Sequence, residues 1–399
     1  MKARVWSAAG LVWLGGGLAF AGEPVFERDA AAAVLAGAYD SDPGVDPEIV
    51  AARASAFGRA GLLFDNQIEA GVGLGVVAER DHPGRDPRGG RAGDCPPATP
   101  ACPAAGAEGV RGPVSGYTSS GQPSDRGARL SLETAYLYVR GGLGEASIGR
   151  SRGAAALVGL SAPSIFVLAG AADAPVDPTG LGSPITRNDI SGQSAKALVQ
   201  TERILGFKGA ISYAPELELE GLDQGPRQRF GDPLTHQSEA IVEAGLSFEH
   251  RFQGGWEAAA SATWATAEDS GGRPAFGRMN AWSLGASLSR EGWTVGASYL
   301  ANDNGWAAGG RDYRALSVSG VIERGAWSFS IEGAAASDDL VFTDVSAVTF
   351  GTRRMISETL SIGGGLTVRE RRSPLAAIGN RVGLHETATG GFIELAMGL

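Results

Sequence analysis

The second half of the chain is a succession of short runs in which apolar residues alternate with small or polar ones. Side chains of an extended strand point alternately to its two faces, so each run has an apolar face and a polar face. The apolar face of the first run consists of Ala240, Val242, Ala244, Leu246 and Phe248. No long helical segment accompanies the runs to cover these faces. Residues 239–399 therefore predict an all-β fold, a transmembrane antiparallel β-barrel with lipid outside and water inside.

Short turns alternate with long polar linkers between the runs. Outer-membrane barrels have this arrangement because one end carries short turns and the other carries long loops. Fifteen runs can be counted, and an Ala-rich run at residues 30–39 completes an even number, as expected of bacterial barrels. A 16-stranded barrel is therefore predicted, with its other strands at residues 55–64, 68–79, 128–140, 144–150, 203–213, 216–222, 239–250, 256–266, 281–289, 293–300, 314–323, 327–335, 343–353, 359–369 and 391–399.

Five tryptophans mark the two ends of the predicted strands. Trp256, Trp293 and Trp327 each follow a short turn. Trp264 and Trp282 lie at the opposite strand ends, beside a long linker. All five fall on apolar faces. Because indole rings favour the membrane–water interface, this distribution predicts two aromatic girdles around the barrel.

The first 21 residues have the features of a secretory signal peptide. Lys2 and Arg4 precede an uncharged apolar stretch, and residues 19–21 form a small-x-small cleavage site. We therefore expect the barrel to comprise residues 22–399; the alternative is an uncleaved membrane anchor. The formal net charge of −10 argues against a nucleic-acid partner.

Two linkers are unusually long. Residues 80–127 are rich in Pro, Gly and Arg and predict an extracellular loop, in which Cys95 and Cys102 would form a disulfide after export. Residues 151–202 begin with an apolar stretch and contain too much Ala, Val and Leu for a solvated loop. We expect this second segment to fold into the lumen, where glycines such as those at 363–365 would leave room for it.

Residues 135–150, Ala-Tyr-Leu-Tyr-Val-Arg-Gly-Gly-Leu-Gly-Glu-Ala-Ser-Ile-Gly-Arg, resemble the hairpin before the constriction loop of Gram-negative general porins, in particular those of alphaproteobacteria. Residues 207–215 are similar to the strand that follows this loop. The resemblance implies that residues 151–202 constrict the channel and that the chain forms a homotrimer in outer-membrane lipid. One departure is Leu399, because most such barrels end in an aromatic residue.

Charges at the narrowest point filter the solutes that diffuse through such a channel. The alternation places Arg59, Arg129 and Lys208 on the lumen wall. Basic side chains facing acidic ones on the inward loop would create a transverse field, and the acidic candidates are Asp173, Asp177 and Asp189. A mild preference for cations is also expected, because further acids face the predicted lumen, namely Glu69, Glu133, Glu243 and Glu257.

No catalytic constellation stands out in the sequence. A hydrolase would need a Ser–His pair oriented by a third group, and nothing places a serine beside any of His82, His236, His250 or His385. No metal site or cofactor is predicted, although residues 40–48 loosely resemble a calcium loop without its terminal Glu. The chain is therefore expected not to be an enzyme.

The sequence thus predicts a channel for passive diffusion of small hydrophilic solutes and ions across the outer membrane of a Gram-negative bacterium. One alternative is a barrel selective for a sugar or another small metabolite. An aromatic ladder on the lumen face would favour it, but the alternation assigns Tyr136 and Tyr138 to the lipid side. The other alternative is a non-transport barrel, such as an adhesin, a structural protein or a membrane hydrolase.

Overall fold

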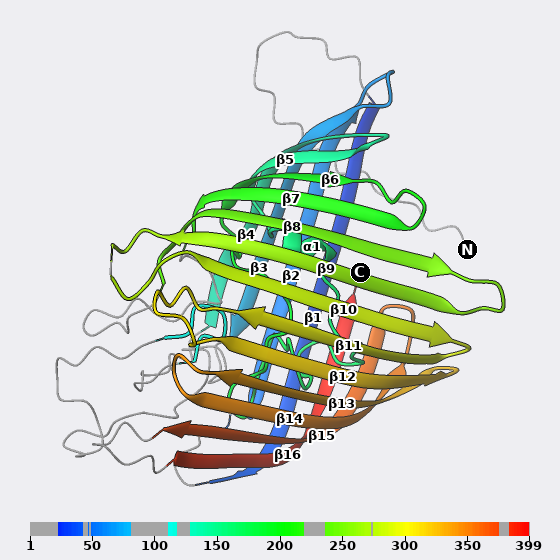
Figure 1. The fold of residues 1–399 in the computed structure, drawn as a ribbon. Helices are drawn as coiled ribbons and strands as arrows, with labels where there is room; N and C mark the ends of the chain where they lie inside the picture. Colours follow the sequence, from blue (N-terminus) through cyan, green and yellow to red (C-terminus); the bar gives the residue numbers. More distant parts are fainter. Residues whose placement is uncertain are drawn as a thin grey trace.

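The computed structural model describes residues 23–42, 47, 49–80, 111–117, 128–218, 236–272, 274–374 and 383–398. Within them, 16 antiparallel strands form one closed barrel in which each strand pairs with its sequence neighbours and β1 pairs with β16 (Figure 1). The predicted 16-stranded barrel is confirmed. The strands are β1 Glu23–Ser41, β2 Val50–Leu63, β3 Glu69–Arg80, β4 Ala128–Gly141, β5 Gly144–Arg150, β6 Ala195–Thr201, β7 Phe207–Glu216, β8 Ser238–Arg251, β9 Glu257–Asp269, β10 Met279–Arg290, β11 Trp293–Asn302, β12 Tyr313–Arg324, β13 Trp327–Asp338, β14 Thr343–Met355, β15 Leu360–Pro374 and β16 Gly383–Gly398.

The pair β6 and β7 corrects one part of the sequence prediction. A turn was expected at Pro215, between strands at residues 203–213 and 216–222. The structure instead turns before β7, where Leu205 and Gly206 have φ values of 51° and 89°. The sequence does not indicate a turn at Leu205, because a bulky branched residue rarely adopts a positive φ. The strand β6 therefore lies inside the segment 151–202 that was expected to be loop.

The outer face of the barrel is apolar, as the alternation predicted. Trp264 on β9 and Trp282 on β10 are paired in register, with 44% and 45% of their surface exposed. The tryptophans at the short-turn end, Trp256, Trp293 and Trp327, are also exposed. In a lipid bilayer these surfaces replace water contact by hydrocarbon contact, which is the arrangement of membrane barrels.

A β-bulge in β4 reverses the predicted orientation of two tyrosines. Gly75 pairs with Thr134 and Val76 pairs with Leu132, so Glu133 is an extra residue in β4. Leu132 is exposed on the outer face, but beyond the bulge the parity changes, and Tyr138 is buried inside the barrel. An extra residue shifts every following side chain to the other face of the sheet. The assignment of Tyr136 and Tyr138 to the lipid side was therefore wrong.

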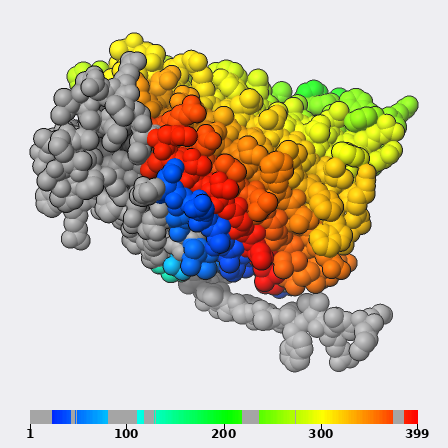
Figure 2. Space-filling view, turned by 90° about the horizontal axis from the view of Figure 1, so that it is seen from below, coloured from blue at the N-terminus to red at the C-terminus, as the bar shows by residue number. Residues whose placement is uncertain are grey.

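The barrel is closed by its first and last strands, which lie side by side on the outer surface in Figure 2. Gly398 at the end of β16 pairs with Ala31, whereas β1 continues back to Glu23 along β2. The first strands therefore extend beyond the end of β16 at the short-turn end of the barrel (Figure 1). The described part of the chain contains no helix that is long and apolar enough to cross a membrane.

Candidate pore constriction

Residues 151–194, here called the inner loop, run inside the barrel between β5 and β6 (Figure 1). The loop opens with a short helix, α1 (Ala154–Val158), which packs against the inner face of β6 to β9. It continues past β9 and β11, where Leu160 N–H donates to Ser261 Oγ at 2.9 Å and Ala162 N–H donates to Ser298 Oγ at 3.2 Å. This position agrees with the prediction that the segment folds into the lumen.

Three buried glutamates of the barrel wall hold the loop backbone. Glu243 on β8 accepts the N–H groups of Ala155 and Ser191 at 3.2 and 2.8 Å. Glu332 on β13 accepts Ala171 N–H at 3.1 Å and the Ser164 hydroxyl at 2.8 Å. Glu394 on β16 accepts three successive N–H groups of the tip, those of Val167, Leu168 and Ala169, at 2.8, 2.7 and 3.4 Å. Carboxylates satisfy several backbone donors at once, so they anchor a segment that has no sheet partners.

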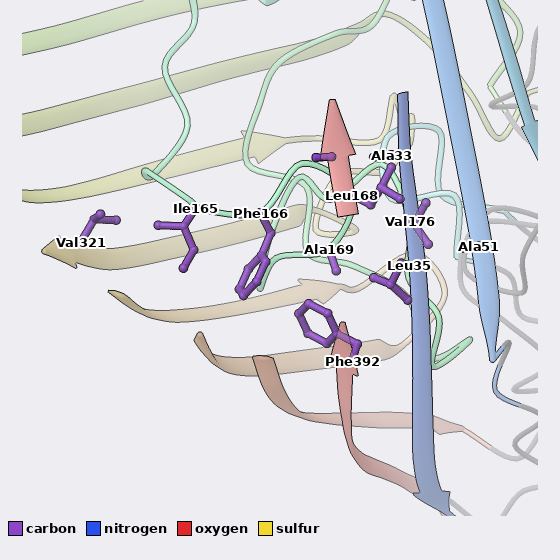
Figure 3. Packing of buried hydrophobic residues seen from close by; sticks show 11 residues of the cluster. Ala33, Leu35, Ala51, Ile165, Phe166, Leu168, Ala169, Val176, Val321 and Phe392 are labelled. Carbon is purple, nitrogen blue, oxygen red and sulfur yellow. The ribbon is translucent and has the colours of Figure 1, made fainter. Parts of the chain in front are cut away.

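The tip of the inner loop is apolar and packs on an apolar part of the wall (Figure 3). Phe166 meets Phe392 of β16 with ring centroids 4.8 Å apart. Beneath the Phe166 ring lie wall glycines, and a Cβ on Gly351 would come within 2.1 Å of the ring. At Gly365, the corresponding distance is 3.0 Å. The prediction that lumen glycines make room for the loop therefore agrees with Gly363 and Gly365, whereas Gly364 does not meet the loop.

Arg369 on β15 ties the returning part of the loop to the wall. Its guanidinium donates to the carbonyl of Gly182 at 3.0 Å and to that of Gly170, and its Nε lies 3.4 Å from Asp177 Oδ1. Asp177 also accepts the N–H of Thr179 at 3.0 Å. Both Arg369 and Asp177 are only 2% exposed. Asp177 thus has a structural partner and is shielded from water.

The other two predicted aspartates also lie in the inner loop. Asp173 accepts the N–H and the hydroxyl of Thr186 at 2.8 and 2.5 Å, which closes the loop on itself. Asp189 is partly exposed and lies near Lys196 and Glu243. Of the three, Asp189 is the one that does not close such a turn, and its Oδ1 atom is buried although the residue is partly exposed.

Arg59 lies on the opposite wall, within a cluster of ion pairs on β1 to β5. It binds Glu145 and lies 3.6 Å from Glu27, while Arg140 binds Glu27 and Glu69 at 2.9 and 2.7 Å. The guanidinium of Arg59 stacks 4.1 Å from the ring of Tyr138, whose hydroxyl donates to Glu69. Nearer the long-loop end, Arg53 faces Glu79 and Glu133 at 3.7 and 3.8 Å.

The remaining predicted site residues are dispersed. Lys208 lies at the short-turn end of β7, opposite Ser247. The backbone of Arg129 pairs with Glu79 at the long-loop end of β4. Arg59 therefore lies among glutamates of neighbouring strands. The three predicted aspartates lie within the inner loop, and no described ion pair joins them to Arg59. Cys95 and Cys102 lie outside the described residues, as does the predicted signal peptide at residues 1–21.

The most important anchoring residues were not singled out from the sequence. Lumen parity predicts that Glu243 faces inward but not that it accepts backbone N–H groups, and the sequence prediction includes no role for Glu332, Glu394 or Arg369. A signal existed, since each is a charged residue at a lumen position in a strand of small side chains. Tyr136 and Arg140 were missed because the bulge at Glu133 is not visible in the alternation.

The sequence itself carries a family signature that agrees with this geometry. A model of the Gram-negative porin family matches residues 61–372. The chain belongs to this family. Its predicted channel function and outer-membrane location are thereby confirmed, and the family and fold are those of non-enzymatic channels. The inner loop of this porin occupies the place expected for residues that constrict such a channel.

Solved structures resemble this porin in fold. The anion-selective porin from Comamonas acidovorans is 13% identical with a TM-score of 0.53, and the match covers 94% of this chain and 100% of the other. In-vitro folded OmpT of Vibrio cholerae, in its trimer form, is 10% identical with a TM-score of 0.51, covering 94% and 99%. At these identities the similarity concerns the fold alone. No curated protein matches the sequence.

Proposed function

We propose that solutes cross this porin between the inner loop and the charged part of the inner face of β1 to β5. The observation that carries the proposal is the one-sided hydrogen bonding of the loop. Its hydrogen-bonded anchors lie on β6 to β16, whereas no described hydrogen bond or ion pair joins it to Arg53, Arg59 or Arg140. On β1 and β2 the loop tip meets the apolar side chains of Ala33, Leu35 and Ala51. The Glu27–Arg140 pair on this wall is open to water, with side chains 44% and 30% exposed.

The charge of this wall supports a preference for cations. Three arginines, Arg53, Arg59 and Arg140, share it with five glutamates, which gives a formal charge of −2 for these groups. An acidic lining raises the local cation concentration. The glutamates are Glu27, Glu69, Glu79, Glu133 and Glu145. On the loop side we propose Asp189 as the acid nearest the path, since Asp173 and Asp177 are engaged in turns.

Reversal potentials in planar bilayers test this function. Purified wild-type protein should open aqueous channels, and a KCl gradient should give a reversal potential of the sign for cation selectivity. The fold is shared with an anion-selective porin. An anion-selective reversal potential would therefore show that this lining does not control selectivity, and absence of any conductance would contradict the channel path itself.

We also infer that the protein forms a homotrimer in outer-membrane lipid. Most outward residues of β1 and β2 between positions 32 and 60 are small, with Val34 among the larger exceptions: Ala32, Ala36, Ala38, Ala52, Ala54, Ala56, Gly58 and Ala60. A flat apolar face favours close packing of a second barrel over loose packing of lipid. One structure with a similar fold is a trimer form. A heat-dissociable trimer on native gels is expected, and Ala56→Trp should weaken it.

We further propose that the chain has no enzymatic activity, no cofactor and a cleaved signal peptide. In the described part, His236 binds Ser238 and the Gly277 carbonyl, His250 stacks on Phe248, and His385 lies 3.5 Å from Glu370. Ser238 does lie beside His236, but both are buried, at 6% and 3% exposure, and the second ring nitrogen of His236 meets the Gly277 carbonyl and not a carboxylate. We therefore propose that these three histidines do not activate a nucleophile. Mass spectrometry of the exported protein should give an N-terminus after residue 21 and a Cys95–Cys102 disulfide.

A further inference from the structure

A second segment of the chain enters the barrel from the long-loop end. Residues 111–117, here called the latch segment, belong to the connection between β3 and β4, which was predicted to form an extracellular loop. The segment is a compact turn, since Gly116 N–H donates to the Gly112 carbonyl and Gly112 N–H donates to the Tyr117 carbonyl, both at 2.9 Å. Ser115 and Tyr117 are each 1% exposed. The segment is therefore packed as tightly as a protein core.

The latch segment is fixed to the wall at β13. The hydroxyl of Ser115 donates to Asp338 Oδ2, and Asp338 Oδ1 accepts Asn304 Nδ2 at 2.9 Å. Ser115 Oγ in turn accepts the N–H of Tyr117 at 3.1 Å, which orients the tyrosine. A Cβ at Gly112 would lie 2.1 Å from Asp338 Oδ2 and 2.2 Å from Ser115 Oγ, so a larger residue there would displace the two hydrogen-bonded side chains. The contact is specific in shape as well as in hydrogen bonding.

Tyr117 connects this segment to the inner loop. Its ring packs edge-on against Tyr313 of β12 with centroids 6.4 Å apart, and its hydroxyl donates to the Ser183 carbonyl at 3.3 Å. Burial raises the pKa of Tyr117, so the hydroxyl stays protonated and can donate. Tyr313 holds the neighbouring Ile185, whose N–H donates to its hydroxyl at 2.8 Å and whose carbonyl accepts from it at 3.0 Å.

The returning part of the inner loop is thus held by two tyrosines, one from the wall and one from a different loop. We propose that the latch segment positions residues 183–185 through Tyr117 and thereby sets the width and steadiness of the constriction. This inference rests on the proposed solute path along the inner loop. Tyr117 acts as a positioning residue, because it affects the constriction only through the inner-loop residues that it holds in place.

Single-channel recording of three variants tests the latch. Tyr117→Ala removes the ring and the hydroxyl, Gly112→Ala pushes the segment away from Asp338, and Tyr117→Phe removes the hydroxyl alone. The first two should raise the unitary conductance, increase the open-channel current noise and admit larger sugars in liposome swelling. Tyr117→Phe should lie between them and the wild type, since it keeps the packing against Tyr313.

The matched control is Tyr213→Ala, because Tyr213 faces outward and is 48% exposed. It should leave conductance, noise and size limit unchanged. Heat-modifiable migration on gels should show a folded barrel for every variant, because the changes lie inside the mouth and outside the strand pairing. Unchanged noise and conductance in folded Tyr117→Ala would overturn the latch. Wild-type protein without channels would instead contradict the proposed function.

Discussion

The carboxylate of Glu394 accepts the backbone N–H of Leu168 at 2.7 Å, so the last strand of the barrel holds the tip of a loop that begins after β5, 11 strands earlier. This contact, like those of Glu243 and Glu332, joins a wall carboxylate to the loop backbone. Backbone N–H groups are present whatever the loop side chains are. The wall residue therefore decides where the loop is held, and loop side chains can vary without loss of the anchor.

Replacing Glu394 by Ala should free the tip of the inner loop. Three N–H groups would lose their acceptor, at a cost of about 1–3 kcal/mol for each one that water does not reach. The expected result is noisier channels and a lower denaturation temperature of the folded barrel. The comparison variant is Glu257→Ala, whose side chain is 52% exposed at the short-turn end. If both variants behave alike in bilayer recordings, Glu394 does not anchor the tip.

Most of the fold follows from the alternation, because a barrel wall between lipid and water imposes it on every strand. The strands near residues 55–64 and from 239 to 369 were predicted to within five residues at each end, whereas β1 begins seven residues and β16 eight residues before its predicted start. The pattern fails where an extra residue breaks the parity, as at Glu133, or where the turn has an unusual backbone, as at Leu205. The bulge is not visible in the residue types, and the turn is marked only by the single glycine Gly206.

The candidate site was less accessible to sequence reasoning for a different reason. Parity shows that Arg59 and Glu243 face inward, but not which of them meets water and which meets the loop. That choice depends on the path of residues 151–194, which is decided by contacts between residues far apart in the chain. Asp177, for example, is shielded by Arg369, a partner 192 positions later that no local pattern indicates.

Substitutions on the charged wall should shift ion selectivity in opposite directions. Arg59→Gln leaves Glu145 without its cationic partner and makes the wall more acidic, so the preference for cations should increase. Glu27→Gln removes the most exposed of these carboxylates, and the preference should decrease. Reversal potentials in a KCl gradient measure both. Shifts of the same sign, or none at all, would mean that ions do not pass along this wall.

Gly351 should not tolerate a methyl group. The added Cβ of Gly351→Ala would meet the Phe166 ring at 2.1 Å, which is less than contact distance. Overpacking of this kind costs typically about 1–3 kcal/mol, and here it should displace the tip of the loop from the wall. Gly333→Ala is the control, because no atom lies within 4 Å of its Cβ position. Thermal denaturation should distinguish the two, and Phe166→Leu should partly restore Gly351→Ala.

Acidification should loosen the long-loop end around His236. Burial lowers the pKa of His236 below its ordinary value of about 6.5, although the hydrogen bond from Nε2 to the Gly277 carbonyl favours the charged form. Because the folded pKa lies below the unfolded one, the unfolded segment binds more protons. The stabilisation is therefore complete above about pH 6.5 and is lost as pH falls through the folded pKa. Hydrogen exchange of the amides near Gly277 and Gly305 should accelerate between pH 7.5 and 5, after correction for the intrinsic exchange rate.

The variant His236→Gln separates this effect from general acid sensitivity. Glutamine can still hydrogen-bond but does not titrate, so the corrected exchange rates near Gly277 should become nearly independent of pH in this range. The control segment is the short turn at residues 291–292, which lies at the other end of the barrel and contains no histidine. If wild type and His236→Gln keep the same pH dependence near Gly277, then His236 does not control the opening of this end.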